Sequence, residues 1–461
     1  MSRLEIDWPD EGAERVRAAE GRLRVAGAAL AHRSFEERLA AVATVLEDWT
    51  KPDSPWRREL AAGLTEATPF TGPTIAEGLE SALRAWRPAD FAACAAREID
   101  GARVDGRRAL VPFEWTTVIA GGALPMPTLL SSLIPLVLGS PVLLRETSKD
   151  PVTARLLARS LAERDGGLAA AFEPIAFPSD DSMALDAALS APCVVATGSD
   201  ETLAAISRRL SPTQRFVGYG HRFSIGVLGP EFPESTYPDV ASDLALDVAR
   251  WDQSGCLSPV LVYLVGWPAD AARRFAADLD TALERVSVAL PRGDLDLETS
   301  VSIAHERSEA RMRSAAGAGM LFEGEQHTIV LEADARPRPA PLGRFLRLCP
   351  VESKDALFRA LEPFSGHLSN VCLAGFREDR AGEVTSIDDR LEETFGLAPT
   401  DARSTGAPVP REWSALGVSR LTKPGRLQTP PVDWPHDGLP LLLPLARFAG
   451  SDFDPSMEEG A

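Results

Sequence analysis

The stretch Trp115–Leu144 contains no charged residue, and it constrains the fold more than any other part of the sequence. A charge-free run of this length suits either a membrane-spanning helix or the interior of a globular protein. Prolines and glycines interrupt it at Gly121, Gly122, Pro125, Pro127, Pro135, Gly139 and Pro141. A spanning helix rarely tolerates so many helix breakers. We therefore predict a strand, a loop, a helix, a turn and a second strand in a buried α/β core, without membrane insertion.

Apolar strands and helices alternate along much of the chain. A capping box at Ser34–Glu37 and helical spacing after it predict a helical segment before residue 96. The expected strands are 118–120, 142–144, 193–196, 260–265, 328–332 and 371–373, and helices are expected at 129–138, after Asp150-Pro151, and at 200–210, 240–251 and 271–288. Such alternation predicts parallel sheets that are covered by helices on both faces.

The chain of 461 residues is longer than one hydrophobic core usually supports, so we predict several domains. The N-terminal helical segment, 1–96, is expected to belong to a cofactor-binding α/β domain at 97–225. A catalytic α/β domain follows at 226–415. The C-terminal segment, 416–461, returns to the cofactor domain or to an arm, and its last residues, 451–461, are expected to be disordered. Turn-forming residues between 97 and 118 predict a β-hairpin arm.

The charge balance limits the choice of partners. The net charge is −19, and such a surface repels nucleic acid and anionic lipid. An anionic substrate would therefore need a local basic pocket. Five scattered cysteines without CxxC spacing predict a reducing cytoplasm, and the six histidines show no metal-binding spacing, so no metal site is expected. The N-terminus has no apolar signal region, which also favours a cytoplasmic location.

Cys256 is the strongest candidate for a chemically active residue. It follows Gly255 in a short loop between an expected helix and an expected strand. Such a loop exposes the sulfur, and the glycine leaves room for a carbonyl group to approach. A thiolate is both a good nucleophile and a good leaving group, which suits thioester chemistry. The alternative is that Cys256 is a small buried apolar residue, as most intracellular cysteines are.

Several common nucleotide-binding and hydrolase motifs are missing. The segment Gly218–Phe223 begins like a dinucleotide-binding glycine fingerprint, but Phe223 stands where the third glycine belongs. No GxSxG nucleophile elbow and no GxxxxGK[ST] phosphate loop are present. A simple Rossmann dehydrogenase is therefore not supported by this motif.

The order of the motifs resembles the aldehyde dehydrogenase superfamily. A strand ends at Arg145, a Thr197-Gly198-Ser199 turn follows, and Cys256 comes next. Within that superfamily the chain resembles the fatty acyl-CoA reductase branch of bacterial luminescence systems. The narrower likeness rests on the stretches 120–125, 219–226, 251–259 and 433–438. It implies two three-layer α/β lobes with a cleft between them, and a β-hairpin arm.

The resemblance also implies roles for particular residues. Cys256 would attack an acyl thioester and release CoA, and its backbone N–H would help to hold the oxyanion. A nicotinamide cofactor would then reduce the acyl-enzyme to an aldehyde. The turn Thr197-Gly198-Ser199 would bind the cofactor at the start of a helix. Arg145 matches the position of a lysine that reaches the adenosine ribose.

The cofactor preference follows from one departure from that family. Hydrolytic members often carry a glutamate where this chain has Ser148. Without that carboxylate a 2′-phosphate meets less repulsion, and Arg145 can pair with it. We therefore expect NADP(H), with NAD(H) as the alternative because Glu146 adds a negative charge beside Arg145. The alternative role for Arg145 is a surface ion pair.

Two further departures bear on the reaction. The glutamate that activates water in hydrolytic members is missing near Tyr219–Gly226, which fits acyl transfer to CoA. Ala123 replaces an asparagine that donates a hydrogen bond to the oxyanion. The loss of such a donor typically costs about 10²- to 10³-fold in rate. The site is therefore expected to be slower, to use another donor or to be inactive.

His221 and His436 are the remaining candidates. His221 can transfer a proton near the thiohemiacetal, because imidazole titrates near neutral pH. The alternative is a structural histidine. His436 beside Asp437 and Gly438 is expected to fix the C-terminal segment.

We predict an NADPH-dependent reductase that converts an acyl thioester into an aldehyde. The acyl donor is expected to be a long-chain acyl-CoA, a carrier-bound thioester or an acyl group from a partner synthetase, and the protein is expected to be a homo-oligomer. One alternative is a cysteine acyltransferase or thioesterase that uses Cys256 with His221 as its base. Another, motivated by Ala123, is a non-catalytic subunit of a reductase complex.

Overall fold

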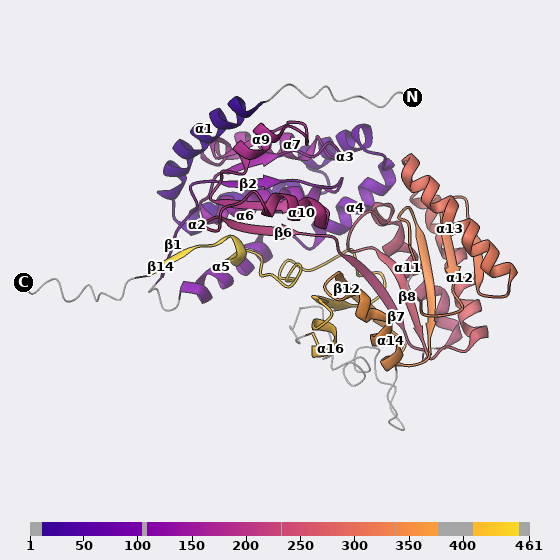
Figure 1. The fold of residues 1–461 in the computed structure, drawn as a ribbon. Helices are drawn as coiled ribbons and strands as arrows, with labels where there is room; N and C mark the ends of the chain where they lie inside the picture. Colours follow the sequence, from indigo (N-terminus) through magenta and orange to yellow (C-terminus); the bar gives the residue numbers. More distant parts are fainter. Residues whose placement is uncertain (1–11, 104–107, 232, 337, 377–408, 451–461) are drawn as a thin grey trace, which may run out of the picture. The chain divides into compact units, whose positions relative to one another are not determined.

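The computed structural model describes residues 12–103, 108–231, 233–336, 338–376 and 409–450. These residues form two compact units, each assembled from separate stretches of chain (Figure 1). The first unit comprises 1–68, 86–221 and 439–461, and the second comprises 69–85 and 222–438. The division differs from the predicted domains, because 69–85 and 416–438 group with the second unit. No helix in the described part of the chain is long and apolar enough to cross a membrane.

The first unit contains a five-stranded parallel sheet in the order β4-β3-β2-β5-β6. Its strands are β2 (Thr116–Ile119), β3 (Val142–Arg145), β4 (Phe172–Ile175), β5 (Cys193–Thr197) and β6 (Arg215–Tyr219). A separate antiparallel pair joins β1 (Arg108–Leu110) to β14 (Phe448–Gly450). The helices are α1 (Ala13–Ala31), α2 (Phe35–Thr50), α3 (Pro55–Ala67), α5 (Pro88–Arg103), α6 (Pro125–Leu138), α7 (Thr153–Arg164), α8 (Gly166–Ala170), α9 (Ser182–Ala188), α10 (Asp200–Ser207) and the 3₁₀ turn η4 (Leu443–Leu445).

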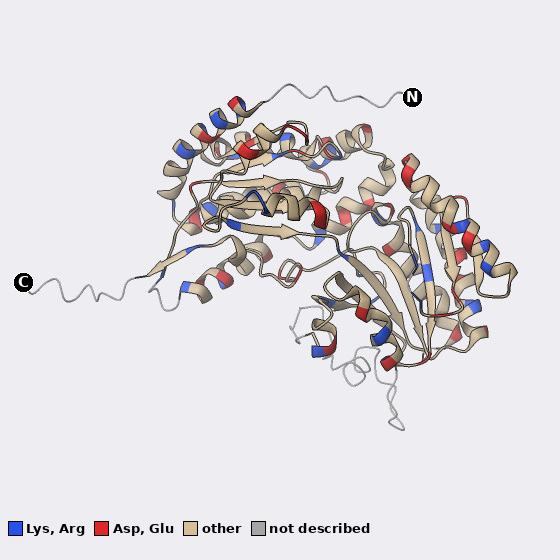
Figure 2. Ribbon diagram, viewed as in Figure 1, with Lys and Arg blue, Asp and Glu red and all other residues tan. Residues whose placement is uncertain are grey.

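Helices cover both faces of this sheet, as the alternation predicted. Ile119 and Leu143 face a core shared with α1 and α9. The residues next to them, Val118 and Leu144, are also buried, which requires a second apolar layer on the opposite face. In Figure 2 the central strands carry few charged residues, whereas the helices carry many. The charge-free stretch Trp115–Leu144 thus forms β2, α6 and β3 in the middle of the unit.

The second unit contains a seven-stranded sheet in the order β13-β12-β7-β8-β11-β10-β9 among the described residues. Only β9 runs antiparallel to its neighbour within this part of the chain. The strands are β7 (Phe223–Leu228), β8 (Pro259–Val265), β9 (Met320–Glu323), β10 (Thr328–Leu331), β11 (Phe345–Val351), β12 (Leu368–Ala374) and β13 (Arg420–Thr422). The helices are α4 (Gly72–Arg84), α11 (Tyr237–Ala249), α12 (Ala269–Ala289), α13 (Leu297–Ala315), α14 (Lys354–Leu361) and α16 (Arg411–Ser414), with 3₁₀ turns η1 (Glu234–Thr236), η2 (Arg250–Gln253) and η3 (Glu362–Phe364).

This second sheet also has an apolar core on each face. On one face α11 and α12 pack against Val262 and Leu264 of β8. On the other face α14 and Trp413 of α16 pack against Leu261 and Tyr263 of the same strand. The alternation along β8 therefore places successive residues in opposite cores. Both units are three-layer α/β structures, which agrees with the predicted fold class.

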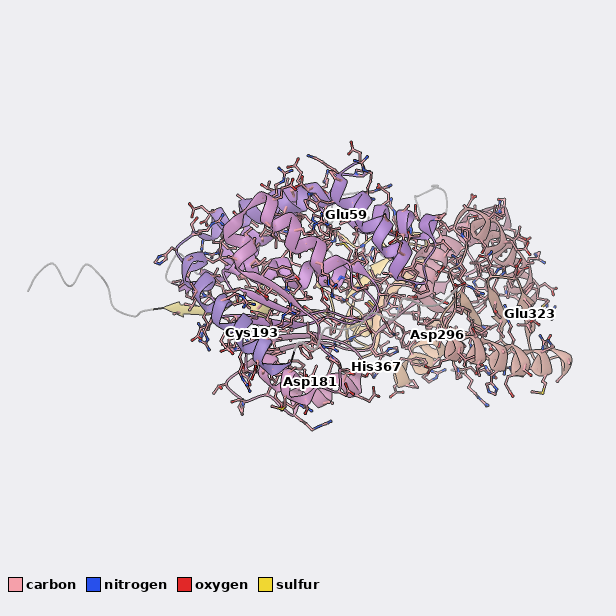
Figure 3. The ribbon with its side chains drawn as sticks, turned by 90° about the horizontal axis from the view of Figure 1, so that it is seen from above. Glu59, Asp181, Cys193, Asp296, Glu323 and His367 are labelled. Atoms are coloured by element: carbon pink, nitrogen blue, oxygen red, sulfur yellow. The ribbon has the colours of Figure 1, made fainter. Side chains whose placement is uncertain are left out.

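Local sequence signals explain several element ends. Ser34 caps α2 in the predicted capping box, with Glu37 bonding back to the Ser34 N–H at 2.7 Å. Asp181 and Asp296, labelled in Figure 3, cap α9 and α13 through their carboxylates. Gly139 ends α6 in a left-handed conformation with φ of 87°.

The predicted hairpin arm at 97–118 is wrong in its first half. Residues 98–101, which were expected to form a turn, lie inside α5. Phe91 and Ile99 are buried on one side of that helix, so tertiary packing outweighs the turn propensity of Gly101. Residues 104–107 lie outside the described residues, and β1 pairs with β14 instead of a neighbouring strand. The predicted disorder of 451–461 also lies outside the described residues.

Candidate active site

Cys256 lies in a short loop between η2 and β8, where the sequence predicted it. All five cysteines lie in the described residues, and only Cys256 is part-exposed; the other four are buried. Cys193, for example, lies inside β5 (Figure 3). Part of this residue, counted with its backbone, is therefore exposed at the surface of its loop. Protein atoms nevertheless surround the thiol closely, and this burial raises its pKa to about 12.

The three residues that lead into this loop have an unusual backbone. Trp251, Asp252 and Gln253 all have positive φ angles, between 49° and 64°. Non-glycine residues in this left-handed region cost on the order of 1–3 kcal/mol each. Such a conformation persists only where surrounding contacts hold it, and each of the three side chains has strong partners.

Asp252 and Gln253 are fixed by contacts with a distant part of the chain. The Asp252 carboxylate accepts hydrogen bonds from the fully buried guanidinium of Arg344 at 2.6 and 3.0 Å and from the Gly293 N–H at 3.0 Å. The Gln253 amide donates to the carbonyls of Pro259 and Phe345 at 2.8 and 2.9 Å, and its oxygen accepts from the Phe345 N–H. These contacts fix the direction in which the chain enters the Cys256 loop.

Trp251 is held by packing against Phe70 and against α4. Its ring lies edge-on to Phe70, with 5.4 Å between the ring centroids. A Cβ atom added at Gly78 would overlap the Trp251 ring, so only glycine fits at that point of α4. The segment 69–85 thus packs against the strained turn of the second unit, which explains why it groups with that unit.

The Cys256 loop itself is anchored to two neighbouring elements. The Ser224 hydroxyl of β7 donates to the Cys256 carbonyl at 2.8 Å, and the Asn370 N–H of β12 donates to the Ser224 oxygen at 3.3 Å. On the far side of the loop, the Gln428 amide donates to the Ser258 hydroxyl and to the Asp247 carbonyl. The backbone around the sulfur is therefore restrained before any substrate binds.

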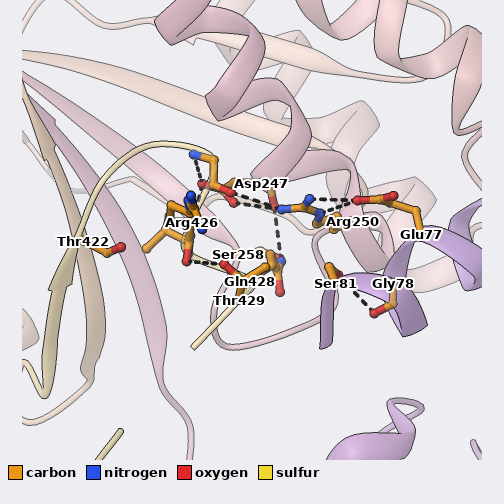
Figure 4. A network of polar contacts seen from close by, with 12 residues as sticks. Glu77, Gly78, Ser81, Asp247, Arg250, Ser258, Thr422, Arg426, Gln428 and Thr429 are labelled. Atoms are coloured by element: carbon orange, nitrogen blue, oxygen red, sulfur yellow. Dashed lines mark hydrogen bonds and ion pairs between the residues drawn. The ribbon is translucent and has the colours of Figure 1, made fainter. Parts of the chain in front are cut away.

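A buried polar network continues from this anchor (Figure 4). The fully buried Asp247 carboxylate accepts from the Gly425 N–H at 2.7 Å. Arg250, which lies 3.8 Å from that carboxylate, also donates to Glu77 at 2.8 and 2.9 Å. Burial raises the pKa of Asp247 to about 7, against the opposing effects of Arg250 and of the backbone N–H groups.

Two charged groups lie near the Cys256 sulfur within the same unit. The negative charge of Asp437 adds to the effect of burial on the Cys256 pKa, whereas the positive charge of Arg222 opposes it. Asp437 and Arg222 lie 3.6 Å apart. The thiol is accordingly protonated at neutral pH, and its attack on a carbonyl group requires a proton acceptor.

The first unit contains the residues expected to bind a cofactor. The chain runs from β2 through β3 to β4 and then returns to β5 on the other side of β2. Ligands of open parallel sheets bind at such a reversal, outside the carboxyl ends of the strands. The loop after β2 and the turn Thr197-Gly198-Ser199 after β5 meet there. A Cβ atom at Gly121 would overlap the Thr197 carbonyl oxygen, so glycine is needed for this close approach.

These residues fit a dinucleotide in part. Ser199 caps α10 by accepting from the Thr202 N–H at 3.3 Å, so this N–H is already used. Asp200 and Glu201 in the first turn are negative, although the Asp200 carboxylate is occupied by the His221 N–H at 2.9 Å. The close approach of the two loops at the strand reversal favours a nucleotide site. The negative charges in the first turn of α10 would repel phosphate groups, so this turn suits the sugar or amide part of a nucleotide better.

Arg145 and Glu146 occupy the end of β3 beside this reversal. The Arg145 guanidinium donates to the Phe177 carbonyl at 3.2 Å and lies 5.2 Å from the centroid of its ring. Its pKa is lowered by burial. Glu146 is buried and accepts a bidentate pair of hydrogen bonds from Arg155 of α7 at 2.8–3.1 Å. Arg155 therefore neutralises the negative charge of Glu146, which would otherwise repel a 2′-phosphate.

Comparison with known proteins agrees with this arrangement. The model of the acyl-CoA reductase (LuxC) family matches residues 31–387. The chain belongs to this family. The family is one of acyl-CoA reductases, the class of oxidoreductase that the sequence predicted. No curated protein matches the chain.

The solved structures that resemble the LuxC-family chain have the aldehyde dehydrogenase fold. Aldehyde dehydrogenase C from Pseudomonas syringae, a mutant with NAD+ and octanal, has a TM-score of 0.68 and 14% identity over 96% of this chain and 91% of that one. A mutant of proline utilization A from Bradyrhizobium japonicum has a TM-score of 0.69 and 16% identity over 96% of this chain. The chain spans only 45% of the length of that protein. An E. coli NADP-dependent enzyme has a TM-score of 0.62 and 15% identity over 90% and 83%.

The structure separates the predicted site residues into two groups. Arg145, the turn 197–199 and His221 belong to the first unit, and Cys256 belongs to the second. His221 is exposed, and both its role in proton transfer and its alternative structural role stay predictions. His436 stacks beside Trp434, with 4.8 Å between the ring centroids, close to Asp437.

Sequence reasoning missed the residues that hold the Cys256 loop. Asp252, Gln253 and Arg344 support the strained turn, and Arg155 neutralises Glu146. Asp252 and Gln253 lay in a stretch already recognised as family-like, so their identity was visible but their backbone conformation was not. Arg344 and Arg155 carried no local signal, because their partners lie elsewhere in the sequence.

Proposed function

We propose that this LuxC-family protein reduces an acyl thioester to an aldehyde through an acyl-enzyme on Cys256. The observation that carries the proposal is the Cys256 loop: it holds the one part-exposed cysteine among the five, on a strained and fully supported turn. Backbone strain of this kind is concentrated at functional sites.

The chain's own residues perform the acylation step. Cys256 attacks the thioester carbonyl, the bond to the CoA sulfur breaks, and CoA leaves with one proton. The Cys256 N–H donates to the oxyanion that forms during the attack. Ser224 holds the Cys256 carbonyl and so restrains the peptide that follows Cys256. A nicotinamide cofactor supplies the two electrons for reduction when it is bound, and Thr197, Gly198, Ser199 and Arg145 would hold it.

NADPH is the proposed cofactor, with a long-chain acyl-CoA as the acyl donor. The pairing of Glu146 with Arg155 supports NADPH, because it removes a negative charge that would oppose a 2′-phosphate. A carrier protein or a partner synthetase is an alternative source of the acyl group. We also propose that the protein works in the cytoplasm as a homo-oligomer.

The test is a cofactor-oxidation assay across acyl-CoA lengths, with Cys256→Ala as the decisive variant. Wild type should consume NADPH only when acyl-CoA is present and should retain labelled acyl groups covalently. Cys256→Ala should lose both activities by at least about 10³-fold, because no other nucleophile replaces the thiol. Cys94→Ala, which removes a buried thiol outside the site, is the matched control and should retain both.

Two outcomes would reject the proposal. Acyl transfer without consumption of NADPH or NADH would indicate an acyltransferase or thioesterase. Equal labelling of wild type and Cys256→Ala would indicate a non-catalytic subunit.

A further inference from the structure

Asp437 presents a buried carboxylate oxygen with no hydrogen bond. Only 6% of the Asp437 side chain is exposed, and its Oδ1 atom has no hydrogen-bond partner in the described part of the protein. Arg222 Nε and His436 Nε2 approach this oxygen to 3.6 and 3.9 Å, which are ion-pair distances longer than a hydrogen bond. A buried acceptor left in this state is costly and calls for an explanation.

The backbone of Asp437 is also strained. Its φ angle is 53°, in the left-handed region, and Gly438 follows with a φ of 78°. Neighbouring contacts hold the turn: the Gly438 N–H donates to the Pro435 carbonyl at 2.9 Å, and the Trp434 indole donates to the Ser419 hydroxyl at 3.1 Å. The fold thus keeps the carboxylate at one place in spite of an unfavourable conformation.

That place is beside the nucleophile. Arg222 immediately precedes β7, and Ser224, two residues later, holds the Cys256 carbonyl. Asp437 pairs with Arg222, so the carboxylate lies at the end of β7 that carries the Cys256 loop. The charges of both residues act on the thiol, in opposite directions.

The acylation step needs a group that takes a proton and later returns it. The Cys256 thiol is protonated at neutral pH, because burial favours the neutral form. The leaving CoA sulfur, in turn, departs more easily when it receives a proton. A proton acceptor near the thiol is therefore required.

We propose that the Asp437 carboxylate is the catalytic base that takes the proton from Cys256 during acylation and returns it to the departing CoA sulfur. This inference rests on the proposed function. The S–H bond of Cys256 breaks and an O–H bond forms on Asp437 as sulfur attacks the thioester carbon. The bond from that carbon to the CoA sulfur then breaks, and the proton passes to CoA, which leaves as a thiol. Asp437 returns to its starting charge, so no other reactant is needed.

Arg222 makes this transfer more favourable. While Asp437 is ionised, its charge opposes a thiolate on Cys256; once it has accepted the proton, only the positive charge of Arg222 faces the sulfur. No hydrogen bond joins Cys256 Sγ to Asp437 Oδ1 in the described residues, so one water or a small shift of the turn completes the path when substrate binds. Arg222 is thus a positioning residue for Asp437.

Asp437→Asn tests the inference, because asparagine keeps the size of the side chain but cannot accept the proton. Rapid-quench measurement of CoA release, with the acyl-CoA that wild type uses best, should show acylation slowed about 10²- to 10³-fold with KM changed much less. Asp437→Glu should recover part of the rate. Asp433→Asn, an exposed residue in the same segment with the same change in charge, is the matched control.

Alkylation of the free enzyme by iodoacetamide separates this role from a purely electrostatic one. Asp437→Asn should alkylate at Cys256 as fast as wild type or faster at neutral pH, because a negative charge near the thiol is lost. Slower acylation together with undiminished alkylation supports a base. Faster acylation and faster alkylation together would overturn the proposal and leave Asp437 as a brake on the thiol.

The design also separates this inference from the proposed function. Normal acylation by Asp437→Asn, together with no acylation by Cys256→Ala, would reject only the role of Asp437 as the base. Normal acylation in Cys256→Ala would reject the proposed function itself. Unchanged far-ultraviolet circular dichroism and undiminished alkylation of Cys256 in Asp437→Asn exclude loss of the fold as the cause of slow acylation.

Discussion

At the scale of single residues, we propose that charge balance at the end of β3 decides the choice between the two nicotinamide cofactors. Glu146 is paired with Arg155, whereas Arg145 uses one of its nitrogens on the Phe177 carbonyl and keeps its remaining donors. A 2′-phosphate at this edge would therefore meet a net positive environment.

Replacement of Arg145 by alanine should weaken NADPH and spare NADH. We expect the affinity for NADPH to fall about 10- to 100-fold, the value of one charge-assisted hydrogen bond, with little change for NADH. Fluorescence titration with each cofactor measures this without turnover. Arg159→Ala, which removes an exposed arginine of α7, is the control. Equal losses for the two cofactors would contradict the assignment.

At the scale of elements, α4 packs against the turn that leads into the Cys256 loop, and this packing depends on the absence of a side chain at Gly78. Gly78 lies in the middle of α4, where alanine would normally stabilise a helix by up to about 1 kcal/mol. The Trp251 ring occupies the space that the added Cβ atom would need. Alanine at position 78 would therefore favour the helix but would disturb the packing of Trp251 in the strained turn.

A pair of glycine-to-alanine variants separates these two effects. Gly78→Ala should destabilise the protein by about 1–3 kcal/mol through overpacking and should slow acylation of Cys256. Gly21→Ala in α1, where nothing lies within 4 Å of the added atom, should be neutral or stabilising and fully active. Urea unfolding and rapid-quench acylation measure both. If Gly78→Ala changed neither stability nor acylation, Trp251 would be free to move away from the added Cβ atom.

The same elements show what the sequence could predict. Apolar periodicity predicted most strands and helices of both sheets, including β2, α6 and β3, because each signal lies within the element itself. The left-handed run Trp251–Gln253 was beyond prediction, since its supports at Arg344 and Phe345 are about ninety residues away. Cys256 was found from its local loop, but Asp437 was seen only as a neighbour of His436.

At the scale of the whole molecule, Asp247 links stability to pH. It is fully buried, and its pKa of about 7 lies above the ordinary aspartate value, so the folded state holds a proton more tightly than the unfolded state. The stabilisation from this proton is complete below about pH 4 and is lost as the pH rises to about 7. Above about pH 7 Asp247 is ionised, and its negative charge then lies beside Arg250 in the network of Figure 4.

Asp247→Asn should remove this dependence. Between about pH 4 and pH 7, Asp247 contributes a decline of up to about 1.4 kcal/mol per pH unit to the unfolding free energy of wild type, and the variant should lack this part. Asparagine retains an acceptor for the Gly425 N–H. Urea midpoints across this range for the two proteins give the difference, and parallel curves would contradict the assignment.

The carboxylate of Glu98 has a consequence for how the chain is built. It accepts from the N–H groups of Leu441, Leu442 and Leu443 at 2.8–3.3 Å and so ties the last described stretch to α5. The polypeptide changes unit four times, after residues 68, 85, 221 and 438. A ribosome therefore cannot finish one unit before it starts the other. Until residues 441–450 have been synthesised, β1 has no strand to pair with, and the Glu98 carboxylate lacks these three hydrogen-bond donors.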